Sequence, residues 1–192
     1  MSRQVGTPRL VSVLVGLTMI VVSAVGFRLS SVPQGFQVVR GTLGDVTRYD
    51  KGLAGVSSVR VGTELRDGDR TVTTPGMFVV VRLTVRADRT EEVRISQTHL
   101  LADDATYDHF GIGDTVSADP GFSSTRDVAY EVSPDRLADL TLEASDVGIV
   151  SGYHQRLRVH LGITAANAAQ WAAAAQGQRV TFDNTTYSVG LS

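Results

Sequence analysis

The hydrophobic positions of this chain follow two different patterns. Residues 10–27, LVSVLVGLTMIVVSAVGF, form an unbroken apolar run that contains no charged side chain. Beyond residue 38, apolar and polar positions alternate with a period of two, which is typical of β-strands that turn one face to a core. The chain is therefore expected to combine an N-terminal apolar segment with an all-β domain.

The longest alternating stretch is MFVVVRLTVR, residues 77–86, whose odd positions from Met77 to Val85 are all apolar. Gly, Asp and Pro turns separate such stretches, and no helical pattern lies between them that could connect parallel strands. We therefore predict an immunoglobulin-like antiparallel β-sandwich over residues 38–163. The shorter stretches that we assign to strands are 36–39, 58–61, 93–96, 127–132, 140–142 and 156–163.

The C-terminal residues 164–192 depart from this alternation. Residues 164–177 are rich in alanine and predict one short helix, with Thr164 as its N-cap and Gly177 as its stop. Trp171 is the only large side chain of this helix. Two further apolar stretches, 179–183 and 187–190, then predict a final hairpin.

The apolar run is interpreted as a transmembrane signal-anchor over residues 10–28. Eighteen residues of helix span about 27 Å, close to the roughly 30 Å of a bilayer core. Residues 1–9 carry two arginines and no acid, so the positive-inside rule places them in the cytoplasm and the domain outside. We thus expect a plasma-membrane protein with a cytoplasmic tail, 1–9, and a short linker, 29–37. Small residues around Ala24 leave open a cleaved signal peptide.

Three segments of the alternating region resemble a known family. They are GMFVVVRLTVRADRTEEVRIS (76–96), LLADDATYD (100–108) and DVAYEVSPDRLADLTLE (127–143). Their order resembles the telokin-like, immunoglobulin-like extracytoplasmic domain of unknown function found in membrane-anchored proteins of Gram-positive bacteria, of the actinobacterial type. The resemblance implies an extracytoplasmic β-sandwich without a recognised catalytic site, and it supplies no site residues.

The composition and the motifs of the chain argue against several classes of function. The chain has no cysteine, which excludes disulfides, a cysteine nucleophile and cysteine ligands for zinc. Its net charge of -2 argues against a nucleic-acid partner. No nucleophile elbow, zinc-protease helix or phosphate-binding loop occurs. We expect neither enzymatic activity nor a cofactor.

The acidic segment 103–114 is the strongest local cluster of chemically active side chains. Oxygen ligands spaced along a loop could bind calcium, but the spacing matches no EF-hand. Asp is also common at hairpin tips, because its side chain bonds to the nearby backbone, so a solvated hairpin is favoured over a metal site. The residues concerned are Asp103, Asp104, Asp108 and Asp114, flanked by His99 and His109.

Three groups of residues are candidates for contact with a partner. If their strands share a sheet, the arginines of the alternating region form a basic stripe that could bind anionic lipid or wall polymer; otherwise they form a solvated face. The loop 145–155 could recognise a partner or fold into the core. Trp171 could dock on a partner or pack on its own domain. The candidates are Arg82, Arg86 and Arg158, with Arg94 and Arg156 beside them, then Ile149, Val150 and Tyr153, and Trp171.

These features together favour a non-catalytic, single-pass interaction module of the cell envelope that contacts an envelope protein. The alternative is a domain that binds envelope lipid or wall polymer through an arginine-rich sheet face.

Overall fold

A computed structural model of the chain describes residues 36–103, 105–111, 113, 115–146, 155–183 and 185–189. The chain divides into two compact units, Met1–Gly35 and Phe36–Ser192, and the fold described here is that of the second. The expected tail 1–9 and signal-anchor 10–28 lie outside the described residues. Within the described ranges, no helix has the length and apolar character needed to cross a membrane.

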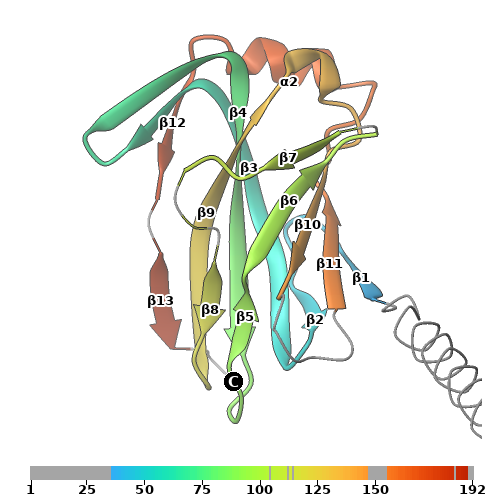
Figure 1. Ribbon diagram of the computed structural model, residues 1–192, viewed down its shortest axis with the longest axis vertical. Helices are drawn as coiled ribbons and strands as arrows, with labels where there is room; N and C mark the ends of the chain where they lie inside the picture. The colour runs from blue at the N-terminus through green and yellow to red at the C-terminus, as the bar shows by residue number, and fades with distance from the viewer. Residues whose placement is uncertain are drawn as a thin grey trace, which may run out of the picture. The chain divides into compact units, whose positions relative to one another are not determined.

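Two sheets pack face to face and enclose one main core (Figure 1). A small two-stranded sheet pairs β5 (Val93–Ile95) with β8 (Val116–Ala118). The five-stranded sheet has the order β1 (Gln37–Gly41), β11 (Gln155–His160), β10 (Thr141–Ser145), β6 (Gln97–Leu101) and β7 (Thr106–Asp108). The six-stranded sheet has the order β12 (Arg179–Phe182), β3 (Gly52–Asp67), β4 (Arg70–Ala87), β9 (Phe122–Val132) and β13 (Thr186–Val189), with β2 (Thr47–Tyr49) paired to β3.

The predicted long strand is the centre of the six-stranded sheet. It is longer than expected, because β4 continues back to Arg70 and forms a hairpin with β3. The odd positions from Met77 to Val85 are buried in the main core, as the alternation predicted. They pack with apolar residues of the facing sheet, such as Leu142 and Val159. The prediction of a β-sandwich is confirmed.

The prediction that all strands run antiparallel is wrong. β1 pairs in parallel with β11, and β12 pairs in parallel with β3. A parallel pair needs a long connection between its strands, but that connection need not be a helix. Here more than one hundred residues, mostly in other strands, separate the members of each pair.

A second apolar cluster covers the outer face of the six-stranded sheet. Phe78 and Val80 of β4 and Ala129 of β9 point away from the main core, yet they are fully buried. Val180 and Phe182 of β12 pack over them, and the cluster is completed by Leu65, Val72 and Phe110. This explains why β4 is apolar at consecutive positions 77–81, as expected for a strand buried on both faces.

The C-terminal helix is shorter than predicted, and the prediction of a hairpin after it is wrong. The helix α2 spans Ala168–Ala175, and Asn167, not Thr164, is its N-cap. Gly177 ends the helix region with a φ of 67°, a left-handed conformation that favours glycine. β12 and β13 do not pair with each other, because β12 pairs with β3 at one edge of the sheet and β13 with β9 at the other.

The described residues 179–183 and 185–189, which contain β12 and β13, therefore cross the outer face of the six-stranded sheet, and we call them the C-terminal strap. Asp127 of β9, whose side chain is fully buried, holds this strap. Its carboxylate accepts a hydrogen bond from the Asp183 backbone N–H at 2.8 Å and forms an ion pair with Arg60 of β3. Arg60 also donates to the Thr181 carbonyl at 3.0 Å, and Arg82 pairs with the Asp183 carboxylate at 2.9 Å. A buried carboxylate and two arginines thus fasten the strap to the sheet.

Tyr49 of β2 joins the two sheets through a buried hydroxyl. Its oxygen accepts a hydrogen bond from the Asp146 backbone N–H at 3.0 Å. Burial raises the pKa of Tyr49 from 10.0 to about 12. A folded-state pKa above the unfolded value means that the stability contributed by neutral Tyr49 is complete below pH 10 and is lost as pH rises toward 12.

We expect Tyr49→Phe to lower the free energy of unfolding by about 1 kcal/mol near neutral pH, since the Asp146 N–H loses its acceptor. Phenylalanine cannot ionise, so the variant should lose less stability between pH 10 and 12 than the wild type. Urea unfolding at a series of pH values measures both effects. The exposed Tyr187→Phe is the control, and parallel alkaline loss in wild type and Tyr49→Phe would contradict the assignment.

Candidate functional site

A row of charged side chains crosses the outer face of the five-stranded sheet. The register places Arg40 of β1 opposite Arg158 of β11, and Arg158 opposite Glu143 of β10. Glu143 in turn lies opposite His99 of β6, and His99 lies opposite Asp108 of β7. Directly opposed residues of neighbouring strands project from the same face. We call this row, with the neighbouring Arg156, the charged face.

Glu143 is the buried centre of the charged face. One carboxylate oxygen accepts from Arg156 at 2.9 Å and the other from Arg158 at 2.7 Å, while the Glu143 side chain is only 8% exposed. The Arg156 guanidinium also stacks over the Phe36 ring, 3.9 Å from its centroid, which adds a cation–π contact. Two arginines are thus held rigid and half-exposed by one carboxylate.

Arg40 leaves this half of the face with an excess of positive charge. It is exposed, and it forms no ion pair with any residue that the structure describes. Arg156 and Arg158 thus share the carboxylate of Glu143, while Arg40, opposite Arg158, has no such partner. An open pocket of about 370 Å³ adjoins them, and its charged lining residues are Arg40, Arg158 and His160 together with Asp103 and Asp139. His160 Nε2 lies 3.5 Å from the Asp139 carboxylate. Arg40, which has no described ion-pair partner, can attract an anionic group here.

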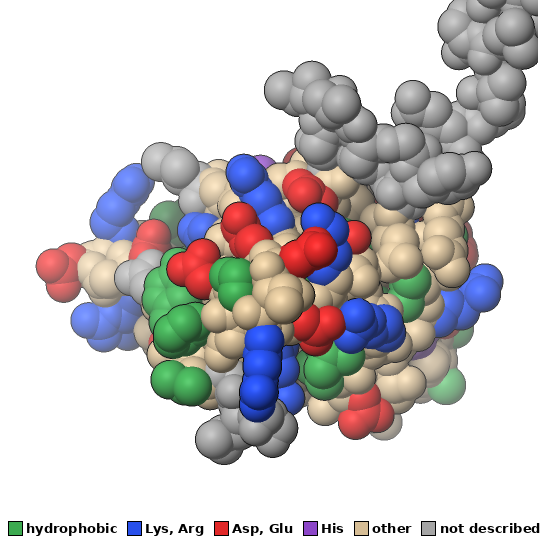
Figure 2. Space-filling view, turned by 90° about the horizontal axis from the view of Figure 1, so that it is seen from below, with side chains coloured by type: hydrophobic (Ala, Val, Ile, Leu, Met, Phe, Trp, Pro, Cys, Tyr) green, Lys and Arg blue, Asp and Glu red, His purple; other side chains and the backbone are tan. Residues whose placement is uncertain are grey.

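The charge distribution differs at the end of the domain that carries the turn between β4 and β5. Figure 2 shows Lys and Arg interspersed there with Asp and Glu. Two ion pairs formed from this turn are Arg48–Asp88 at 2.8 Å and Lys51–Glu91 at 2.6 Å. Exposed pairs of this kind contribute little stability and create no field of one sign.

The expected basic stripe is not formed. Arg82 and Arg86 lie on β4 of the six-stranded sheet, whereas Arg158 lies on β11 of the five-stranded sheet. The outer faces of the two layers of a sandwich point in opposite directions, so these arginines cannot share one surface. Arg82 is also engaged by Asp183 of the C-terminal strap. The arginines that do lie together are Arg40, Arg156 and Arg158.

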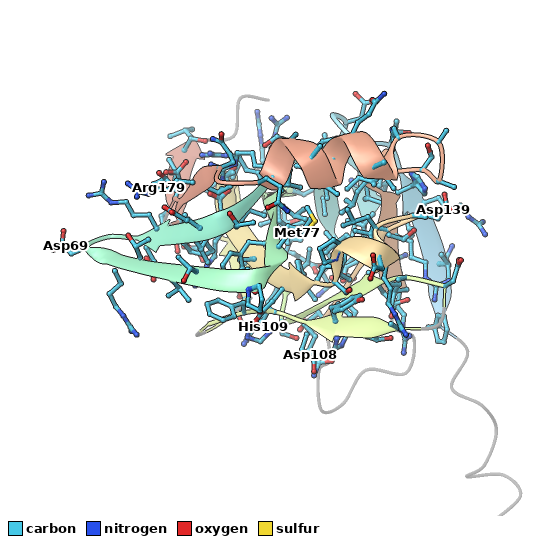
Figure 3. The ribbon with its side chains drawn as sticks, turned by 90° about the horizontal axis from the view of Figure 1, so that it is seen from above. Asp69, Met77, Asp108, His109, Asp139 and Arg179 are labelled. Atoms are coloured by element: carbon cyan, nitrogen blue, oxygen red, sulfur yellow. The ribbon has the colours of Figure 1, made fainter. Side chains whose placement is uncertain are left out.

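The acidic segment and its two histidines do not converge on a metal site in the described residues, where no three ligating side chains lie together. His99 pairs with Asp108 at 3.0 Å on the charged face. His109 is the next residue after Asp108, so its side chain projects to the other side, as Figure 3 shows. Asp104 and Asp114 lie outside the described residues.

Trp171 is half-buried and packs against the main core, as do Ala168 and Ala172 of the same helix. The structure thus places this side chain on its own domain. Ile149, Val150 and Tyr153 lie outside the described residues, and their assignment to a recognition loop stays a prediction.

Sequence reasoning missed an exposed apolar patch at the free edge of the six-stranded sheet. Tyr187 and Val189 of β13 are 68% and 69% exposed, and Phe122 of β9, opposite Val189, is 44% exposed. The three side chains share one face of the sheet. No described strand pairs with the outer edge of β13. We call these three residues the edge patch. In the sequence, the alternation of Tyr187 and Val189 with a polar residue in YSVG was the signal that could have indicated it.

Comparison with known proteins gives two similar solved structures and no family. No protein-family model matches the chain, and no curated protein matches it. The yjhA protein from Bacillus subtilis is 12% identical, with a TM-score of 0.47, covering 62% of this chain and 98% of its own. An uncharacterised β-sandwich protein from Clostridium difficile is 8% identical, with a TM-score of 0.40, covering 65% of this chain and 95% of its own.

Proposed function

We propose that this protein is a single-pass, membrane-anchored interaction module of the telokin-like, immunoglobulin-like type. It is a non-catalytic accessory or scaffolding component of the cell envelope, with its β-sandwich outside the plasma membrane. The apolar segment 10–28 with its basic flanks supports the anchor and the orientation. The lack of catalytic motifs in the sequence supports a binding role.

The edge patch is the observation that favours a protein as the partner. An edge strand offers unpaired backbone N–H and C=O groups, to which an extended segment of another protein can add as a further strand. Beside this edge, Phe122, Tyr187 and Val189 offer exposed apolar area, and aromatic residues are enriched at protein interfaces. The partner is therefore an envelope protein that presents an extended segment with apolar side chains.

We expect a photoreactive phenylalanine at position 187 to crosslink one envelope protein in intact cells, since this side chain lies at the centre of the edge patch. The same amino acid at Thr106, exposed on the β7 edge of the other sheet, is the control. Val189→Lys should weaken the adduct at least tenfold, because it buries a charge in the contact. An adduct that is equally strong at Thr106, or unchanged by Val189→Lys, would exclude this surface.

The second candidate function is binding of an anionic envelope lipid or wall polymer, and the charged face favours it. Two arginines that share one carboxylate, with Arg40 beside them, form a surface that phosphate groups could neutralise. Relative to the expected arginine-rich face, this site keeps Arg156 and Arg158 and adds Arg40. It does not include Arg82 and Arg86 of β4 or Arg94 of β5.

We expect the full-length chain to bind phosphatidylglycerol in mixed micelles more tightly than phosphatidylcholine, and this preference should fall steeply as salt is raised. The double variant Arg40→Ala/Arg158→Ala should lose most of the preference, whereas Arg82→Ala/Arg86→Ala on the other sheet should keep it. Equal losses from the two double variants would indicate a general charge effect rather than a site.

A further inference from the structure

A cavity of about 320 Å³ lies at the outer face of the six-stranded sheet, apart from the edge patch and the charged face. It is lined by the far end of the β3–β4 hairpin, residues 109–111 and 113, β9 and the C-terminal strap. Figure 3 shows His109 beside this hairpin, whose tip carries Asp69. The volume falls within the range of about 300–1,000 Å³ that is typical of small-molecule sites.

The walls of this cavity are apolar and already in place. Leu65 and Ala129 are almost fully buried members of the second apolar cluster. Phe110 is held edge-to-face against Phe78, with ring centroids 5.1 Å apart. Phe182 closes the cavity from the strap, which Asp127 fastens to the sheet. A ligand therefore meets a preformed apolar surface and need not order it.

Polar groups at the rim give the cavity a preference for negative charge. The described charged residues that line it are Arg70, Arg126 and one carboxylate, Asp67, which lies opposite Arg70 in the β3–β4 register. Arg126 is positioned by donating to the Thr115 carbonyl at 3.0 Å. Arg70 is exposed and makes no ion pair with any described residue, so its guanidinium is available to a ligand. A carboxylate can accept two parallel hydrogen bonds from such a group.

We propose that this cavity binds a small amphipathic carboxylate. The apolar body of the ligand lies between Phe110, Phe182 and Ala129, and its carboxylate pairs with Arg70. The site goes beyond the proposed interaction function, and it does not depend on the membrane anchor or on the edge patch.

The probe for this site is 4-phenylbutyrate, with uncharged 4-phenylbutanol as the matched ligand, titrated into the full-length chain by calorimetry. We expect saturable binding of the acid, at least tenfold tighter than that of the alcohol. Arg70→Ala should remove this difference and leave the alcohol's affinity unchanged. Arg86→Ala, an exposed arginine on the same strand but away from the cavity, is the control.

Ala129→Leu tests the apolar part by filling the cavity, and it should weaken both ligands at least tenfold. Because Ala129 is buried, urea unfolding is measured alongside the titration to check that the variant folds. Val72→Trp, at the half-buried rim, is a second variant that fills the cavity. Absence of saturable binding at millimolar ligand would overturn the proposal. So would full binding by a folded filling variant, or an equal effect of Arg70→Ala and Arg86→Ala.

Discussion

Replacing Asp127 with alanine should lower the free energy of unfolding by about 3 kcal/mol and loosen the C-terminal strap. The carboxylate is fully buried, and its Oδ2 atom pairs with Arg60 and accepts from the Asp183 N–H. Its removal leaves the guanidinium of Arg60, whose side chain is 33% exposed, without its counter-charge. Removing one partner of such a pair costs more than the pair itself contributes. Asp127→Asn keeps an acceptor for the Asp183 N–H and should cost less.

Urea unfolding followed by the fluorescence of Trp171, the only tryptophan, measures the global effect. Hydrogen exchange at the Asp183 amide reports on the strap itself, and we expect it to accelerate in Asp127→Ala more than exchange in β9 does. The control is Asp119→Ala, which removes an exposed carboxylate just before the same strand. A loss below about 1 kcal/mol, with unchanged exchange at Asp183, would show that apolar packing alone holds the strap.

Replacing Glu143 with alanine should have the next largest effect, a loss of about 2–3 kcal/mol. The variant leaves Arg156 and Arg158 without their shared carboxylate, next to Arg40. Like charges on neighbouring strands repel one another, and salt screens such repulsion at half-exposed groups. The loss should therefore shrink as ionic strength rises, whereas the Asp127→Ala loss should change little.

Urea unfolding at low and high salt separates these two behaviours, and Glu92→Ala, an exposed acid in the turn after β4, is the control. Glu143→Gln keeps the shape and an acceptor, so it should lose less than the alanine variant. If the charged face binds phospholipid, Glu143→Ala should also tighten phosphatidylglycerol binding, because it removes the internal competitor. A salt-independent loss without tighter binding would assign Glu143 a packing role alone.

Most of the main core could be predicted from the chain. The odd positions of residues 77–85 are apolar, and all of them are buried, because successive side chains of a strand point to opposite faces. The segments 127–132, 140–142 and 156–163 likewise overlap β9, β10 and β11. Gly177 marks the end of the C-terminal helix region, since its positive φ suits glycine.

The errors share one cause, which is pairing between residues distant in sequence. The stretches 179–183 and 187–190 have the pattern of a hairpin, but each finds a partner strand more than fifty residues away. The arginines at 82, 86 and 158 share a pattern but not a sheet. Phe78 and Val80 follow the outward positions of β4, and only the strap that covers them explains their burial.

The chain alone determined which residues form strands and which face of each strand is apolar, because side-chain alternation is a local property. It also determined that no cysteine chemistry occurs. Only the tertiary structure decided which strands are neighbours. The strand order in turn decided which residues form the proposed sites. Arg40 meets Arg158 across a parallel pair whose strands are more than one hundred residues apart, and Asp127 meets Asp183 through a strap that crosses three strands. Such contacts depend on the packing of the whole core, which no local pattern encodes.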